Sequence, residues 1–218
     1  MTDDSVLGDT SRRRLLLGVG TGVAVAAAGC TSGNPSGADR VPVRGDGDAD
    51  VTLEVYEDLN CPTCRQYAQT VFPAVQTNYL TEGRIRYEHR DFVVTDPRDQ
   101  TGPARRAANA AREVYDRHGN GAFWEFTASV FDNQGSLGPG APAFLGGLAD
   151  DLGFDGGAVE AAASNLEYDD AIDADMERGQ ALGVRGTPSF VLDGDLLSPN
   201  LRTLASDLAQ ELDRALSE

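Results

Sequence analysis

Residues 51–64 read VTLEVYEDLNCPTC, an alternating, β-branched segment that runs directly into two cysteines separated by a Pro-Thr dipeptide. The alternation predicts a β-strand over residues 51–56. After Cys61, apolar residues recur at helical spacing, which predicts a helix over residues 65–80 with a kink at Pro73. The cysteine pair is therefore expected at the N-terminus of a helix that follows a strand.

A thiol in that position has a distinctive chemistry. The unpaired N–H groups of the first helical turn and the helix dipole both stabilise a thiolate, which is the nucleophile and the better leaving group in disulfide exchange. Cys61 is predicted to be the exposed nucleophile, and Cys64, one turn further in, the shielded resolving thiol. Together they are expected to form a redox-active disulfide.

Two other interpretations of the pair remain. A zinc site would need two more ligands, but there is no second CxxC motif, and His89 and His118 are not at ligand spacing. An inert structural disulfide would close a loop of only two residues, which restrains little unfolded-chain entropy. Redox catalysis is favoured over both, with no metal and no cofactor.

The rest of the chain predicts an α/β fold, because strands are interleaved with helices. The folded domain is expected over residues 51–217, with a helical insertion at about 101–182. The further predicted elements are a strand at 84–92, helices at 104–117, 122–131, 141–152, 156–165 and 168–182, a hairpin over 188–197 and a closing helix at 201–216.

A second motif lies far from the first. Residues 183–191 read GVRGTPSFV, which places Pro188 at the start of a predicted strand. A proline there cannot donate to the ladder and is unexpected unless the backbone geometry is special. The plainer alternative is an ordinary proline on an edge strand.

Three segments together, residues 56–64, 89–92 and 184–190, resemble those of DsbA-like thiol–disulfide oxidoreductases of the thioredoxin superfamily. The resemblance spans about residues 51–217. It implies a thioredoxin-like α/β fold with a helical insertion, and a cis Thr187–Pro188 bond packed beside the cysteines, presenting the Thr187 backbone to an extended substrate segment. The site residues that it implies are the catalytic Cys61 and Cys64 and the active-site loop residues Pro62, Thr63, Thr187 and Pro188.

The chain departs from that family at one position that concerns proton transfer. Many relatives carry a buried carboxylate six residues before the nucleophile, whereas this chain has Val55 there, flanked by Glu54 and Glu57. Either a neighbouring carboxylate substitutes for it or the proton moves through water. No acid or base is assigned from the sequence.

Other residues near the motifs receive simpler roles. The Pro62-Thr63 dipeptide lacks the His found in strongly oxidising members, so the sequence does not predict a redox potential. Tyr56 and Phe92 are expected to be hydrophobic platform residues. His89 and His118 are expected to be surface or packing residues rather than catalysts.

The N-terminal segment has the parts of an export signal. In residues 1–29, three arginines precede a short apolar run, which resembles a twin-arginine signal peptide. Small residues before Cys30 resemble a lipobox, so Cys30 is expected to be lipidated, although Ala27 stands where Leu is more usual. An uncleaved N-terminal anchor is the alternative. Residues 30–50 are expected to be a flexible tether.

The charge balance limits the possible partners. The chain has 218 residues with 35 acidic against 18 basic side chains, a net charge of −17, and every basic residue is Arg. Nucleic acids and anionic lipids require clustered positive charge, so neither is an expected partner, and membrane contact is expected only through the N-terminal lipid or signal anchor. The acidic surface is typical of a halophilic protein.

These observations predict a protein thiol–disulfide oxidoreductase at the outer face of the cell membrane. Its expected substrates are exported proteins with thiols, and its preferred direction is disulfide formation. A membrane partner of the DsbB or vitamin K epoxide reductase type would re-oxidise it. The alternatives are a reductase or isomerase of exported thiols, and a lipoprotein that binds copper through Cys61 and Cys64.

Overall fold

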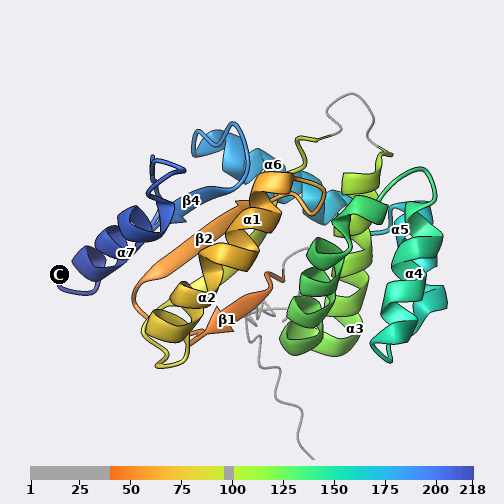
Figure 1. Ribbon diagram of the computed structural model, residues 1–218, viewed down its shortest axis with the longest axis horizontal. Helices are drawn as coiled ribbons and strands as arrows, with labels where there is room; N and C mark the ends of the chain where they lie inside the picture. The colour runs from red at the N-terminus through yellow and green to blue at the C-terminus, as the bar shows by residue number, and fades with distance from the viewer. Residues whose placement is uncertain (1–39, 96–100) are drawn as a thin grey trace, which may run out of the picture. The chain divides into compact units, whose positions relative to one another are not determined.

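The computed structural model describes residues 40–95 and 101–218, and these form a mixed α/β domain (Figure 1). The five-stranded sheet has the order β1-β3-β2-β4-β5. Strand β2 pairs in parallel with β3, whereas the other three pairings are antiparallel. The strands are β1 (Val43–Gly45), β2 (Thr52–Glu57), β3 (Arg86–Asp91), β4 (Ser189–Leu192) and β5 (Asp195–Leu196).

Helices account for most of the other described residues, so the predicted α/β fold with a helical insertion is confirmed. None of the helices in the described ranges is both long enough and apolar enough to span a membrane. The helices are α1 (Pro62–Thr70), α2 (Phe72–Val75), the π-helical turn η2 (Gln76–Leu80), α3 (Pro103–Asp132), the 3₁₀ turn η3 (Gln134–Ser136), α4 (Ala141–Asp151), α5 (Gly156–Asn165), α6 (Asp169–Ala181) and α7 (Leu204–Ala215).

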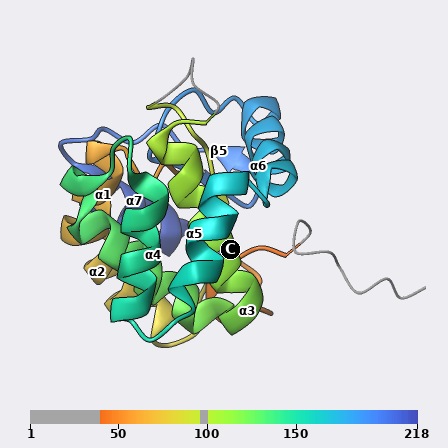
Figure 2. The same ribbon diagram turned by 90° about the vertical axis from the view of Figure 1, so that its right-hand side faces the viewer.

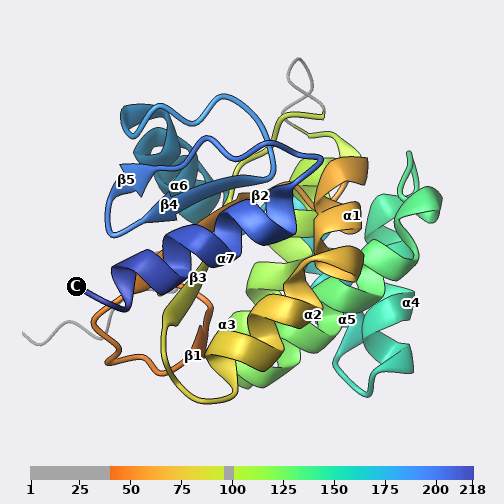
Figure 3. The same ribbon diagram turned by 60° about the vertical axis from the view of Figure 1, so that its left-hand side comes forward.

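The central strand β2 sends alternate side chains to opposite faces of the sheet, as the period of a strand requires. Leu53 and Val55 join the larger hydrophobic core, which also contains residues of α1 and α7. Tyr56 belongs to a second apolar cluster, and Glu54 pairs with Arg178 of α6. Figure 3 shows α1 and α7 on one side of the sheet and α6 on the other. The two faces of β2 thus contact different helices.

The predicted helix over residues 65–80 begins earlier and is interrupted. Helix α1 starts at Pro62, and α2 starts at Phe72 with Pro73 in its first turn. A proline is tolerated there because the first-turn N–H groups have no intrahelical partner. The predicted interruption near Pro73 is therefore confirmed, and the chain continues through the π-helical turn to β3.

The insertion is built around α3, which was predicted as two helices. It is continuous from Pro103 to Asp132 except at Gly119, whose φ of 78° and ψ of −168° break the helical geometry. A glycine is needed there because a positive φ is unfavourable for other residues. Helices α4 and α5 pack against α3 and against each other (Figure 2).

The predicted boundary between tether and domain at residue 50 is wrong. Val43–Gly45 forms β1 and pairs with β3, and backbone groups of Val43 bond to Asn120 Oδ1 at 2.8 Å and Trp124 Nε1 at 3.3 Å. Because these contacts use the backbone of the segment, its Gly- and Asp-rich composition does not reveal them. The predicted signal peptide, Cys30 and the start of the tether lie outside the described residues.

Candidate active site

Cys61 lies at the junction between the end of β2 and the start of α1. It is the N-cap residue of α1, with φ −83° and ψ 121°, and Pro62 occupies the first helical turn. The Cys61 N–H donates to the Asp58 carbonyl oxygen at 2.9 Å. The sequence prediction of a cysteine at a helix N-terminus is therefore confirmed.

Asp58 stabilises the turn that precedes Cys61 through hydrogen bonds to its carboxylate, a role that was not predicted from the sequence. Its buried carboxylate accepts hydrogen bonds from the N–H groups of Asn60 (2.8 Å), Val94 (2.9 Å) and Thr95 (2.8 Å). Burial raises the pKa of Asp58, and these backbone bonds oppose the increase. The Asp-x-Asn spacing is typical of an Asx turn and could have indicated the contact with Asn60.

Gln134 supports the same turn from the helical insertion. Its buried side-chain amide donates to the carbonyl oxygens of Leu59 at 2.9 Å and Cys61 at 3.0 Å. These bonds join segments more than seventy residues apart in the chain. No local sequence signal identifies this contact.

The second motif lies against the first. The Thr187–Pro188 peptide bond is cis, as the resemblance implied, and Cys61 Sγ lies 3.5 Å from the Thr187 carbonyl oxygen, to which the protonated thiol donates. The next residue, Ser189, begins β4 and is opposite Tyr56 of β2. The six sequence-predicted site residues therefore converge: Cys61, Pro62, Thr63 and Cys64 at the start of α1, and Thr187 and Pro188 before β4.

The two cysteines are free thiols in different environments. Cys64 is fully buried, as predicted. Cys61 was predicted to be exposed but is only 7 % exposed, because the distant Thr187 segment lies against it. Its small exposed area still makes it the more accessible of the two sulfurs.

The pKa values of the two thiols are driven in opposite directions. Hydrogen bonding from the Cys64 thiol, aided by Thr187 and by N–H groups of the first helical turn, lowers the pKa of Cys61 to about 5 despite partial burial. Burial raises the pKa of Cys64, and the bond to Cys61 and the charge of Glu57 raise it further. Near neutral pH, Cys61 is a thiolate and Cys64 a thiol.

Glu57 is the carboxylate on the same face of β2 as Val55, one pleat closer to the cysteines. It is 4 % exposed, and its Oε2 lies 3.4 Å from His89 Nδ1. Its Oε1 has no hydrogen-bond partner among the described residues. Glu57 is therefore a buried carboxylate with an unused oxygen, and its charge acts on Cys64.

His89 is a buried partner of two carboxylates, so the option of a surface position is wrong. Its Nε2 lies 3.2 Å from Asp91 Oδ1, and its ring packs edge-on against Phe123. Burial disfavours the charged ring, but bonding to Asp91 and Glu57 raises the pKa of His89 to about 9. The histidine is therefore positively charged at neutral pH. His118, in contrast, is exposed and stacks on Phe154.

Glu54, the other candidate neighbour of Val55, lies on the opposite face of β2. Arg178 binds both of its carboxylate oxygens, at 2.7 and 2.6 Å, and Arg90 lies 3.2 Å away. Burial raises the pKa of Glu54, but these arginines, led by Arg178, leave it below its ordinary value. Glu54 is therefore a fixed charge of an ion-pair network and is separated from the cysteines by the sheet.

Tyr56 and Phe92 are buried apolar neighbours on that opposite face. Their ring centroids are 6.1 Å apart at an interplanar angle of 86°. A Cβ atom on Gly179 of α6 would lie 2.8 Å from Tyr56 Cε1 and 2.9 Å from Phe92 Cδ2. The close approach of α6 to the sheet therefore requires glycine at position 179.

Comparison with known proteins agrees with this geometry. The family model described as "Thioredoxin" matches residues 38–207. The chain belongs to the thioredoxin family. The DsbA-like resemblance is also confirmed: the chain is 25 % identical over 171 residues to disulfide bond formation protein D of Bacillus subtilis, covering 76 % of this chain and 73 % of that protein.

The crystal structure of oxidised BdbD from Bacillus subtilis has the same fold. It superposes with a TM-score of 0.72 at 21 % identity, covering 82 % of this chain and 94 % of that chain. The chain is also 32 % identical over 183 residues to Na(+)/H(+) antiporter NhaA 1 of Salinispora arenicola. That match covers 84 % of this chain but only 25 % of the antiporter, so the thioredoxin-family chain spans about a quarter of that relative.

Proposed function

We propose that this thioredoxin-family chain is a protein thiol–disulfide oxidoreductase that works chiefly as an oxidase through Cys61 and Cys64. The observation that carries the proposal is the unequal environment of the two thiols. Cys61 has a pKa of about 5 and some access to solvent, whereas Cys64 is buried with a raised pKa. An accessible low-pKa thiol and a protected resolving thiol are the two components that disulfide exchange requires.

The oxidative reaction begins from the Cys61–Cys64 disulfide. A substrate thiolate attacks Cys61 Sγ, the Cys61–Cys64 bond breaks, and Cys64 leaves as a thiolate that takes up a proton. A second substrate thiolate then attacks the substrate sulfur of the mixed disulfide, which releases Cys61 as a thiolate and leaves the substrate oxidised. Two electrons have then passed to the cysteine pair.

Glu57 is proposed as the group that exchanges a proton with Cys64. It lies on the strand face directed to the larger core, its Oε1 is unpartnered among the described residues, and its charge raises the pKa of Cys64. Protonated Glu57 donates to the departing Cys64 thiolate, and ionised Glu57 accepts the proton when Cys64 attacks during re-oxidation. This assignment chooses between the two routes that the sequence left open.

Stabilisation of the Cys61 thiolate supports the proposed direction of the reaction, which is disulfide formation in the substrate. A low Cys61 pKa stabilises the reduced pair relative to the disulfide, which makes the disulfide a stronger oxidant. The proposed substrates are exported proteins with free thiols. A membrane partner of the DsbB or vitamin K epoxide reductase type would accept two electrons and two protons from the pair.

The proposed location is the outer face of the cell membrane. It rests on the twin-arginine-like segment of residues 1–29 and the lipobox-like residues before Cys30. Mass spectrometry of the chain purified from membranes would reveal a diacylglycerol-modified N-terminal Cys30. An intact N-terminus would instead support the uncleaved anchor.

A copper-binding function is the weaker alternative. In the described ranges no cluster of three or more His, Cys, Asp or Glu side chains is arranged to hold a metal. The cysteine pair would therefore supply only two soft ligands, and its opposed pKa values serve exchange rather than two thiolate ligands. Stoichiometric copper binding without turnover in a peptide-oxidation assay would favour this alternative.

The reduction potential of the Cys61–Cys64 pair tests the oxidase proposal. We expect a value closer to the roughly −120 mV of a strong oxidant than to the roughly −270 mV of thioredoxin. A value near −270 mV with an ordinary Cys61 pKa would favour the reductase instead. Trapping with Cys64→Ala tests exchange itself: substrates should remain attached to Cys61, whereas Cys61→Ala should trap none at that position.

A further inference from the structure

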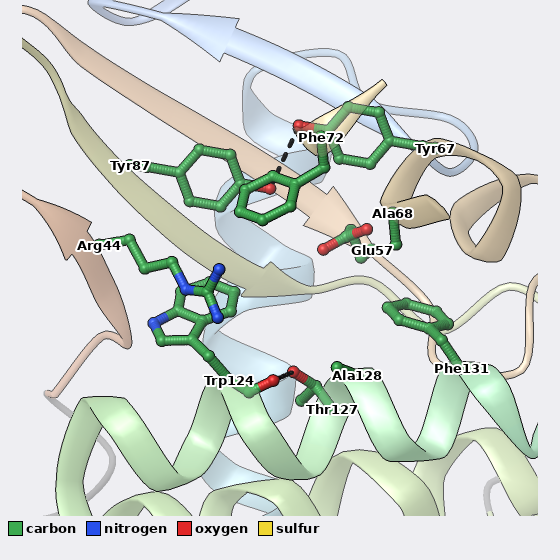
Figure 4. Close-up of a pocket in the computed structure, with 10 residues that line it drawn as sticks. All are labelled: Arg44, Glu57, Tyr67, Ala68, Phe72, Tyr87, Trp124, Thr127, Ala128 and Phe131. Atoms are coloured by element: carbon green, nitrogen blue, oxygen red, sulfur yellow. Dashed lines mark hydrogen bonds between the residues drawn. The ribbon is translucent and has the colours of Figure 1, made fainter. Parts of the chain in front are cut away.

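A half-open cavity of about 80 Å³ lies between α1, α2 and the second half of α3 (Figure 4). Five of its ten lining residues are aromatic, and two charged side chains reach into it from opposite ends. None of the exchange steps above requires a space of this size. The chemistry of its lining therefore calls for a separate account.

Glu57 supplies the negative end of the cavity. Its side chain is 4 % exposed, and its Oε1 is unpartnered within the described parts of the chain. Figure 4 shows the carboxylate directed into the open space, with Phe131 and Ala68 beside it. A buried carboxylate oxygen with neither a donor nor a cation beside it is costly, and the positive charge of a bound ammonium group would offset that cost.

Arg44 supplies the positive end. Its guanidinium carbon lies 4.7 Å from the centroid of Trp124 and 5.1 Å from that of Phe72, so it stacks at the entrance of the cavity. It also donates to Gln76 Oε1 at 3.2 Å. The remaining N–H groups of a guanidinium can bind a carboxylate, with which its planar fork is geometrically matched.

Between the two charges, the wall is a belt of aromatic rings. Tyr67 and Phe72 are 6.3 Å apart between centroids, Phe72 and Tyr87 are 5.4 Å apart, and Tyr87 and Trp124 are 5.7 Å apart. The Tyr67 and Tyr87 hydroxyls lie 3.3 Å apart and share a hydrogen bond. Such rings attract ammonium groups, most strongly the poorly hydrated quaternary ones.

From this lining we infer that the cavity binds a small zwitterion, with its ammonium group at Glu57 among the aromatic rings and its carboxylate at Arg44. A lone cation would be repelled by Arg44, and a lone anion by Glu57, whereas a zwitterion complements both ends. Each water-sized group needs about 10–15 Å³ of cavity volume. The cavity of about 80 Å³ therefore holds roughly five to eight non-hydrogen atoms. That size fits an amino acid or betaine and excludes a peptide.

The chain contains its own reporter for this site. It has a single tryptophan, Trp124, and that residue forms part of the cavity wall. Glycine betaine is the probe, titrated into the full-length reduced chain in molar salt while tryptophan fluorescence and binding heat are recorded. We expect a saturable change in both signals. Tetramethylammonium and acetate, which carry one charge each, should bind at least tenfold more weakly.

Variants test the assigned contacts. Glu57→Gln and Arg44→Gln should each weaken glycine betaine binding about tenfold or more, while the exposed Glu125→Gln and Arg214→Gln provide charge-matched controls with unchanged affinity. Ala68→Leu fills the cavity without altering either charge and should abolish binding. Circular dichroism confirms that each variant is folded before its affinity is compared.

The inference would be overturned if the heat and fluorescence changes were absent or rose linearly without saturation, which would mean that the cavity holds only water. Equal affinity in Ala68→Leu would place binding elsewhere. Binding is measured without a disulfide substrate and repeated in the Cys61→Ser, Cys64→Ser double variant. If zwitterion binding fails, the proposed disulfide exchange is therefore unaffected. If disulfide exchange fails, the inference of zwitterion binding is likewise unaffected.

Discussion

The sulfur of Cys61 lies 3.5 Å from the carbonyl oxygen of Thr187, a residue 126 positions further along the chain, and donates a hydrogen bond to it when protonated. This contact places the nucleophile beside the start of β4, the segment that we propose pairs with an extended substrate. It also explains why so little of the Cys61 side chain reaches solvent.

The first prediction concerns the pH dependence of Cys61. Because its pKa falls from an ordinary value near 9 to about 5 in the folded dithiol, iodoacetamide should modify Cys61 with a half-maximal rate near pH 5. The measurement uses the wild-type chain, and proteolysis followed by mass spectrometry identifies the modified cysteine. The Cys64→Ala variant is unsuitable because the Cys64 thiol is the main donor that stabilises the Cys61 thiolate.

The same shift makes stability depend on pH. A group whose pKa is depressed on folding stabilises the folded state fully above its unfolded pKa and loses that effect as pH falls through its folded pKa. The Cys61 contribution should therefore be complete above about pH 9 and lost near pH 5. Urea unfolding of the reduced chain and of Cys61→Ser should diverge with rising pH across this window. Parallel pH curves would contradict the lowered pKa.

The second prediction tests Glu57 in proton exchange. In Glu57→Gln, stopped-flow measurements should show re-oxidation of the dithiol slowed by at least about tenfold, since general acid–base groups typically contribute about 10²–10⁴. Alkylation of Cys61 should retain its pH midpoint near 5. Glu54→Gln, on the other face of β2, is the matched control and should alter stability rather than this rate. Equal slowing in both variants would point to a structural effect.

The third prediction concerns the support of the active-site turn by Gln134. Gln134→Ala removes two buried hydrogen bonds, to Leu59 and Cys61, and should lower the free energy of unfolding by about 1–3 kcal/mol. The exposed Gln210→Ala in α7 should change it by less than about 0.5 kcal/mol. Equilibrium denaturation in molar salt measures both. Equal values for the two variants would show that the amide bonds contribute nothing.

The fourth prediction compares two glycines in helices. Gly179→Ala would place a Cβ 2.8 Å from the Tyr56 ring and should destabilise the fold by about 1–3 kcal/mol, as overpacking does. Gly147→Ala in α4 meets no atom within 4 Å and should stabilise it by about 0.5–1 kcal/mol through the entropy of the unfolded chain. Thermal unfolding should show opposite shifts. A stabilising Gly179→Ala would refute the close approach of α6.

The fifth prediction follows from the net charge of −17. Unscreened surface carboxylates repel one another, so both the melting temperature and the exchange rate should rise between dilute buffer and molar salt. The buried pairs of Arg112 with Asp91 and Asp175 are screened less and should persist at high salt. A melting temperature independent of salt would contradict the halophilic interpretation without affecting the redox proposal.

The sequence predicted best what depends on local pattern. Helix α5 has the predicted bounds, 156–165, and the strand–CxxC–helix order is present. Glycine-rich stretches and the CPTC motif mark these features directly in the chain. The cis Thr187–Pro188 bond, which the family resemblance implied, is also present. The prediction failed at β1, where a three-residue ladder with β3 depends on backbone groups that composition does not report.

The missed features of the site arise from contacts between distant segments. Cys61 is covered by Thr187, Gln134 reaches the active-site turn from the insertion, and His89 is enclosed by Asp91 and Glu57. The sequence shows that Glu54 and Glu57 both lie close to Val55, but it does not show which of them is paired. In the structure Glu54 is bound by Arg178, whereas Oε1 of Glu57 has no partner among the described residues.

The break of α3 at Gly119 separates two sets of contacts along one helix. Before it, Arg112 pairs with Asp91 and Asp175, and after it come Trp124 of the cavity wall and, just beyond the helix end, Gln134. A mutation at Gln134 can change the surroundings of Cys61 while the CPTC motif and the ion pairs of the first segment stay intact. A substitution in the helical insertion can therefore alter the environment of the Cys61–Cys64 pair without any change in the CPTC sequence.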